Sequence, residues 1–161
     1  MEVKDWITLA AAVISLFAAG VSVTALILNR RVSIGQAETA LRTSIRSTRQ
    51  FVNNLSIQLA DIVDGRREDE LKAADKRRIE AVRMAFMEAI EENLNAYEDA
   101  CAKYVDGKID RTRFKKNYFT EIRNLCECPK SSPIYEMLNP ESTSRFRSVW
   151  GVYHEWFNQG K

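Results

Sequence analysis

A stretch of about 23 uncharged residues near the amino terminus constrains this chain more than any other feature of its sequence. It runs from Trp6 to Leu28 and contains no Asp, Glu, Lys or Arg. As a helix it would be roughly 34 Å long, enough to cross a hydrocarbon core of about 30 Å with some tilt. A lone segment in such a core must satisfy its backbone hydrogen bonds internally, and a helix does so. The sequence therefore predicts a single transmembrane helix over residues 6–28.

Two other kinds of apolar segment fit this stretch less well. A secretory signal peptide carries a positive amino-terminal region, a short apolar run and a small-residue cleavage site. Here the first five residues are slightly acidic, and the small residues Ala18, Ala19 and Gly20 lie in the middle of the run. A buried helix of a soluble protein normally shows a polar face. This stretch offers only Ser and Thr as polar residues.

The charges at the two ends of the stretch predict its orientation. Residues 1–5 hold two acidic residues against Lys4, whereas Arg30 and Arg31 follow the stretch directly. Lys and Arg close to the ends of a span mark the cytoplasmic side. We therefore expect an extracytoplasmic tail over residues 1–5, a juxtamembrane segment over 29–35 and a cytoplasmic helical domain over 36–161. Arg30 and Arg31 would lie at the lipid headgroups of the inner (cytoplasmic) membrane.

Apolar residues recur with helical spacing through the rest of the chain. The spacing predicts a helix over residues 36–63, either separate from the membrane helix or continuous with it, and a second long helix over 68–105. Asp64-Gly65 and Asp106-Gly107 supply the turns that follow them. The sequence contains no alternating run typical of a strand. It therefore predicts an all-α fold in which the transmembrane helix is followed by a long helical hairpin or bundle.

Three shorter helices are expected towards the carboxy terminus. The first begins after Asp110, a good N-cap residue, and ends at Cys128-Pro129. A single helical turn over 134–138 and a last helix over 140–157 follow. The last helix carries a stripe of aromatic residues, which at this spacing is more typical of a core than of a surface that stacks bases. The stripe consists of Phe146, Trp150, Tyr153 and Phe157, with Trp156 beside it.

The cysteines indicate a reducing compartment. There are three, Cys101, Cys126 and Cys128, and their odd number and spacing do not suggest a disulfide framework. Cys101 lies on the apolar stripe of the second long helix and is predicted to be a small buried hydrophobe. Cys126 and Cys128 with His154 fall short of the four ligands that a structural zinc site requires. We therefore expect no metal-binding residues.

Motifs of enzymes are missing from the sequence. It has no phosphate-binding loop, no dinucleotide fingerprint, no zinc-protease motif and no nucleophile elbow. His154 is the single histidine and stands in no Ser or Cys motif. We expect the protein not to be an enzyme, with no catalytic residues and no cofactor.

A basic face on the helix after the membrane span is the clearest candidate for binding. Arg42, Arg46 and Arg49 are spaced i, i+4, i+7 and share one side of that helix. Two interpretations stay open. In the first, the face is solvated or pairs with the acidic residues of the second helix, within the bundle or its oligomer. In the second, it binds a phosphate-bearing ligand or a protein partner. Arg42 would lie ~18 Å beyond Arg30, further than a Debye length of about 8 Å, which argues against lipid. The net charge of +2 argues against nucleic acid.

Two patterns favour a homo-oligomer. Ala11, Ser15 and Ala19 recur every four residues with Gly20 beside them, and such rows of small residues let transmembrane helices approach closely. The predicted helix over 36–63 has heptad-like apolar spacing, which is typical of a coiled-coil seam. The residues of this seam are Leu41, Ile45, Val52, Leu55 and Leu59.

The carboxy-terminal half carries a resemblance on Tyr97-Glu98, Cys101, the turn from Gly107 to Asp110 and Trp156. It resembles small bacterial single-span membrane proteins of uncharacterised activity that have a helical cytoplasmic domain. The overall layout is also similar to that of membrane effectors of bacterial antiphage defence. The resemblance implies a topology but no chemistry. The sequence favours a non-enzymatic membrane-anchored module that binds and oligomerises, as a defence or signalling effector; the alternative is a passive accessory subunit of a larger membrane complex.

Overall fold

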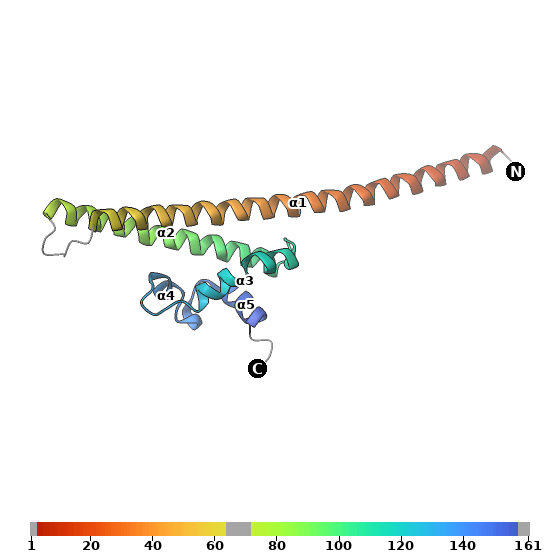
Figure 1. Cartoon of the computed structure of the whole chain (residues 1–161). Helices are drawn as coiled ribbons and strands as arrows, with labels where there is room; N and C mark the ends of the chain where they lie inside the picture. The colour runs from red at the N-terminus through yellow and green to blue at the C-terminus, as the bar shows by residue number, and fades with distance from the viewer. Residues whose placement is uncertain (1–2, 64–71, 158–161) are drawn as a thin grey trace. The chain divides into compact units, whose positions relative to one another are not determined.

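A computed structural model describes residues 3–63 and 72–157 of the chain, without the side chains of residues 3–5 and 7–13. Every regular element in these ranges is a helix, so the predicted all-α fold is confirmed (Figure 1). The elements are α1 (Val3–Val63), α2 (Ala73–Val105), α3 (Arg111–Cys126), α4 (Pro133–Leu138), the 3-10 helix η2 (Glu141–Thr143) and α5 (Arg147–Phe157).

The first helix is much longer than its apolar stretch. α1 continues through residues 29–36, so of the two alternatives drawn from the sequence the continuous helix is the one observed. Gly35 is the only interruption of the pattern there, and one glycine costs a helix only about 1 kcal/mol relative to alanine. Contacts within the chain divide it into two units, Met1–Ala37 and Glu38–Lys161.

The first unit presents an apolar helical surface. From Ile14 to Leu28 every side chain is exposed, and the large apolar ones have exposed fractions between 51% and 76%. The hydroxyls of Ser22 and Thr24 donate to backbone carbonyls one turn earlier, at 2.9 Å each. Such bonds satisfy the polar side chains without any outside partner. Among the described residues this helix is the one that is long and apolar enough to cross a membrane, a composition shared by membrane spans and signal sequences.

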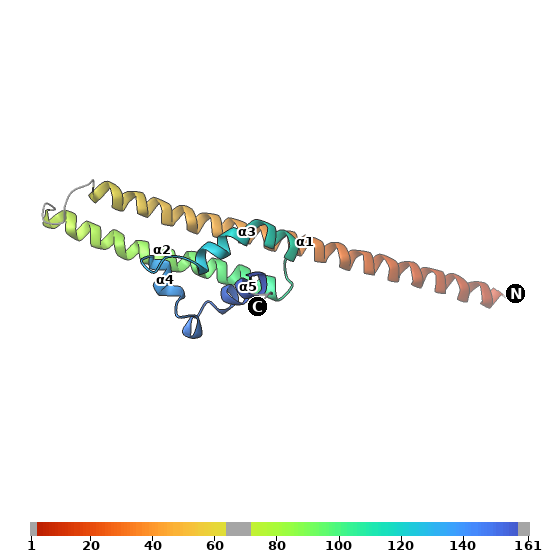
Figure 2. The ribbon, with the colours of Figure 1, turned by 60° about the horizontal axis from the view of Figure 1, so that its bottom comes forward.

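The second unit is a helical bundle built around α2. This helix packs against α4 and α5, and α3 packs against the same two helices. The end of α1 runs alongside α2 (Figure 2) and contributes its own apolar side chains to the core. Those buried on α1 are Leu41, Ile45, Leu55 and Ile62. The heptad-like seam is thus covered largely by the chain's own helices.

Two predicted helix ends are confirmed. Asp110 caps α3, because its carboxylate accepts a hydrogen bond of 2.9 Å from the backbone nitrogen of Arg113. α2 ends at Val105 and is followed by Asp106 and by Gly107, which has a φ of +68°. That left-handed conformation favours glycine after a helix. The predicted turn at Asp64-Gly65 and residue 68, the predicted start of the second helix, lie outside the described residues. α2 begins at Ala73, later than predicted, because Lys72 before it has an extended backbone.

The last helix begins later than predicted. Residues 141–143 form η2 instead, and α5 starts at Arg147. The cause lies on α2, where the Glu98 carboxylate accepts hydrogen bonds from the backbone amides of Ser148 at 2.9 Å and Val149 at 3.0 Å. These amides have no partner within their own helix, so Glu98 fixes where the helix starts. α3 ends two residues before Cys128, with Glu127 as its C-cap.

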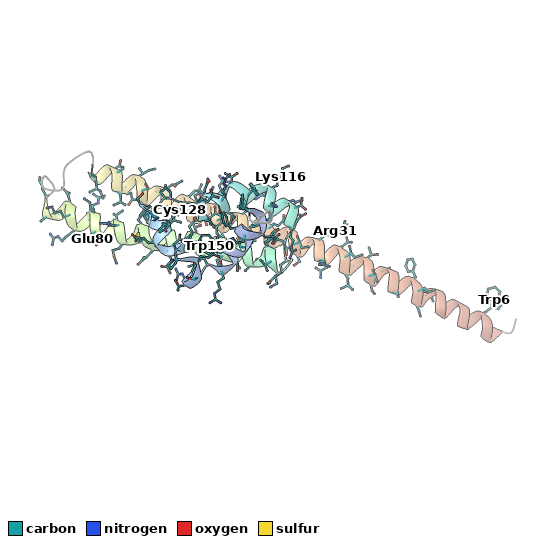
Figure 3. The ribbon with its side chains drawn as sticks, turned by 90° about the horizontal axis from the view of Figure 1, so that it is seen from below. Trp6, Arg31, Glu80, Lys116, Cys128 and Trp150 are labelled. Atoms are coloured by element: carbon teal, nitrogen blue, oxygen red, sulfur yellow. The ribbon has the colours of Figure 1, made fainter. Side chains whose placement is uncertain are left out.

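The residues assigned to the core are found there. Phe146 is 1% exposed, and Trp150, which lies within the bundle in Figure 3, and Trp156 are each 8% exposed. Tyr153 and Phe157 are half-buried at the edge of the cluster. Cys101 is fully buried, as predicted. The indole nitrogens of Trp150 and Trp156 donate to the Leu138 carbonyl and the Tyr104 hydroxyl, so neither polar group is left unpaired in the core.

Candidate functional site

The described small residues of the apolar stretch, Ser15, Ala19 and Gly20, are exposed on α1. Ser15 and Ala19 are one helical turn apart and both exposed. A Cβ atom added at Gly20 would meet nothing within 4 Å. The side chain of Ala11 lies outside the described residues. Arg30 and Arg31 are exposed on α1, and neither pairs with a described acidic residue.

The three arginines of the basic face come together on one groove in the second unit. This groove has a volume of about 580 Å³ and lies between α1 and α3. Arg42, Arg46 and Arg49 line it from α1, and Glu121 lines it from α3. The remaining lining residues are Ile45, Gln50 and Asn53 of α1 and Asn117 and Tyr118 of α3.

Arg49 differs from the other two because its charge is already paired. Its Nη2 lies 2.7 Å from Oε2 of Glu121, and it also hydrogen-bonds to the Tyr97 hydroxyl. The Tyr97 hydroxyl in turn donates to the same Glu121 oxygen at 2.8 Å. The hydrogen bond to Glu121 raises the pKa of Arg49, and burial together with that carboxylate raises the pKa of Tyr97. Both groups therefore keep their protons, and Arg49 serves to join α1 to α2 and α3.

Arg42 and Arg46 keep their charges for solvent or a ligand. Both side chains are exposed, and in the described part of the chain neither contacts a carboxylate. Burial and Glu121 raise the pKa of Tyr118 on the opposite wall, and the facing guanidinium of Arg42 partly offsets this. The groove thus holds three guanidinium groups against one carboxylate, which leaves a positive surplus.

The acidic residues of α2 do not neutralise this surplus. Glu91 pairs with Arg145 at 2.6 Å, Asp99 pairs with Lys103 at 2.6 Å, and Glu98 caps α5. Within the described part of one chain, the basic face therefore does not meet the acidic block at Arg42 and Arg46. Pairing between copies in an oligomer, a solvated face and a binding face stay open.

Sequence reasoning missed Glu121 and Asn117 as members of the groove, and it missed Tyr97 as a partner of Arg49 behind it. Tyr97 stands on the apolar stripe of α2 and carries no sign of a polar role. Glu121 could have been suspected, since it is the single acidic residue among the basic residues of α3. Most of those basic residues have structural partners. Arg111 donates to two carbonyls at the end of α2, and Arg113 pairs with Glu38 at 2.9 Å.

The thiols and the histidine form no reactive cluster. Burial raises the pKa of Cys126 to about 12 and that of Cys101 well above its usual range, and such protonated thiols are poor nucleophiles. His154 lies 2.6 Å from Glu141. Within the described residues no group of three or more His, Cys, Asp or Glu side chains is placed to hold a metal ion.

Comparisons with known proteins returned no family model, no curated protein and no solved structure that matches this chain.

Proposed function

We propose that the protein is a non-enzymatic binding module anchored in the inner membrane by residues 6–28, with residues 36–161 in the cytoplasm. One observation supports the anchor above all others. Every described large apolar side chain from Ile14 to Leu28 is more than half exposed. Water disfavours a continuous apolar surface of this kind, whereas a lipid core covers it without needing a protein partner. The backbone of α1 is hydrogen-bonded within the helix throughout, as a lipid environment demands.

A cleaved signal peptide is the competing interpretation of an apolar helix near the amino terminus. The residues before the apolar stretch speak against it, because Glu2 and Asp5 replace the positive region of a signal. α1 also continues well past the apolar stretch, so no change of conformation marks a cleavage region.

The orientation rests on Arg30 and Arg31 at the carboxy-terminal end of the span. The cysteines support the same side of the membrane. All three are free, and Cys101 and Cys126 are buried in the bundle as thiols. Reduced thiols are the normal state in the cytoplasm, while proteins of oxidising compartments more often pair them.

The proposed module self-associates through its span and binds through its cytoplasmic bundle, in the manner of a defence or signalling effector. The seam on α1 is largely buried within the bundle, so the small residues Ser15, Ala19 and Gly20 are the better candidates for contact between copies. A passive accessory subunit is the alternative. Light scattering of the purified protein in detergent separates them, since the effector forms a stable homo-oligomer and the accessory subunit stays monomeric.

Membrane extraction tests the anchor. The intact chain should stay in the membrane pellet after an alkaline carbonate wash, and its mass should still include residues 1–28. Leu16→Arg should reduce insertion, because an arginine at the centre of a span costs about 2.5–3.5 kcal/mol, and Leu16→Ile is the matched control. A protein that is released by the wash, or that has lost its first residues, would contradict the anchor.

Thiol labelling tests the orientation. Cys128 is half-buried while Cys101 and Cys126 are buried, so a membrane-impermeant maleimide reports mainly on Cys128. Labelling of Cys128 should require a permeabilised inner membrane, whereas a cysteine introduced by Lys4→Cys should react from outside. Cys128→Ser supplies the background. Labelling of Cys128 in cells with an intact inner membrane would reverse the proposed topology.

A further inference from the structure

The spacing of Arg42 and Arg46, the two groove arginines that pair with no described carboxylate, suits a single anion. Arg42 and Arg46 are four residues apart on α1 and both line the groove. Side chains at this spacing on a helix have Cβ atoms about 5–6 Å apart, so two long guanidinium side chains can converge on one group. Guanidinium groups bind phosphate with paired hydrogen bonds as well as with charge.

Uncharged hydrogen-bonding groups surround these arginines. The side-chain amides of Gln50, Asn53 and Asn117 line the groove and bond to no other side chain in the described part of the chain. The Tyr118 ring lies on the α3 wall beside them. The volume of about 580 Å³ falls within the range of roughly 300–1,000 Å³ that is common for small-molecule sites.

The one carboxylate of the groove does not oppose an anion. Glu121 is held by Arg49 and by the Tyr97 hydroxyl, so its charge is compensated within the protein. This pair also fixes α1 against α3, so the two walls of the groove are set before any ligand arrives. A preformed site loses less conformational entropy on binding than one that must be ordered.

We propose that this groove binds a soluble phosphorylated small molecule of nucleotide size, with Arg42 and Arg46 as the residues that hold its phosphate. This inference deepens the proposed function, since it names the class of ligand that the helical bundle takes up. The inference rests on the proposed function in one respect only, namely that the protein meets the ligand in the cytoplasm. A lipid headgroup offers the same phosphate chemistry, and the experiment below separates the two sources.

Calorimetry on the full chain in a neutral detergent provides the test. The probes are sodium pyrophosphate, AMP and ATP, each titrated at fixed ionic strength. In a second arm, pyrophosphate is replaced by detergent micelles that contain phosphatidylglycerol. We expect saturable binding of at least one soluble probe and weaker binding of the lipid.

Matched variants locate the binding. Arg42→Gln and Arg46→Gln should each weaken the probe roughly tenfold or more, because each removes a charge-assisted contact. Arg46→Lys keeps the charge but loses the paired hydrogen bonds of a guanidinium, so its affinity for the probe should lie between those of the wild type and Arg46→Gln. Arg83→Gln on α2 removes the same charge outside the groove and should leave affinity nearly unchanged. Thermal unfolding of every variant checks that the bundle is intact.

Three results would overturn the proposal. They are the absence of saturable binding of any soluble probe at millimolar concentration, an equal loss of affinity in Arg83→Gln and Arg46→Gln, and binding confined to the phosphatidylglycerol arm. An acidic peptide partner would give the first of these results. The titration is done in detergent, so its outcome does not depend on whether the membrane and topology experiments succeed. Likewise, a failure to bind any probe would not affect the results of those experiments.

Discussion

The carboxylate of Glu98 lies 3.0 Å from the backbone nitrogen of Val149, and this contact joins α2 to the first turn of α5. Its other oxygen accepts from the amide of Ser148. A carboxylate at this position satisfies amides that have no partner in their own helix and complements the positive end of the helix dipole. The side chain thus acts as an N-cap supplied by another helix.

Removal of this cap should destabilise the bundle. Glu98→Ala should lower the free energy of unfolding by about 1–2 kcal/mol, as the loss of an N-cap does. Urea denaturation of the full chain in neutral detergent, followed by tryptophan fluorescence, measures it. Glu92→Ala changes an exposed acidic residue of the same helix and should stay within about 0.5 kcal/mol. Equal effects of the two substitutions would show that Glu98 has no capping role.

The aromatic core should be far more sensitive than the surface. Trp150→Ala should cost about 3–5 kcal/mol and Leu94→Ala about 2–5 kcal/mol, because both remove large buried side chains. Phe51, which is 49% exposed, serves as the control when changed to alanine. The same urea experiment applies. A loss below ~0.5 kcal/mol at Trp150 would mean that the stripe faces solvent or a partner instead of the core.

The sequence was most informative where the cause of a structure is local. Helical spacing predicted the helices, and the N-cap role of Asp110 depends on a residue three positions away. The aromatic stripe of α5 showed that this helix has a buried side. Periodicity does not say what covers a buried side, so the seam of Leu41, Ile45 and Leu55 looked equally suited to a second copy of the chain.

The sequence alone did not predict contacts between residues that lie far apart along the chain. Glu98 belongs to a run of acidic residues on α2, and nothing near it indicates that it sets the start of α5 about 50 residues later. In the same way, the spacing of Arg42, Arg46 and Arg49 gave no reason to expect one of them to be paired and the others not. Only the position of Glu121 on α3 shows that Arg49 is paired and that the other two are not.

Bulky residues in the row of small side chains should disrupt self-association of the span. Ala19→Ile and Gly20→Ile keep the helix apolar but prevent close approach of two backbones. We expect crosslinking in membranes and oligomer size in detergent to fall in both variants, with insertion unchanged. Leu16→Ile, which conserves volume, should behave like the wild type. Unchanged crosslinking in all three would mean that the span is an anchor without a role in assembly.

Alkaline pH should destabilise the bundle. Burial raises the pKa of Cys126 from 9.0 to about 12, and burial also raises that of Tyr97 above its ordinary 10.0. At alkaline pH the folded state then binds more protons than the unfolded state. The contribution of these groups to the free energy of unfolding is therefore complete below pH 9 and is lost as pH rises towards 12. Denaturation midpoints between pH 8 and pH 11 measure the decline. The part of this decline between about pH 9 and pH 10 comes from Cys126, so Cys126→Ala should remove it. Midpoints of the wild type that do not change with pH would contradict the prediction.

A fragment of this chain that is soluble without detergent must keep the part of α1 whose side chains are buried in the bundle. These side chains are Leu41, Ile45, Leu55 and Ile62. Glu38 extends the same requirement, since its carboxylate bonds to the Asp110 amide at 3.0 Å and to Arg113. A fragment that begins at residue 64 would lose the whole strip of α1 that covers α2 and would expose apolar surface prone to aggregation. A cut between the apolar stretch and Glu38 keeps that strip, so soluble expression should depend sharply on a few residues around this boundary.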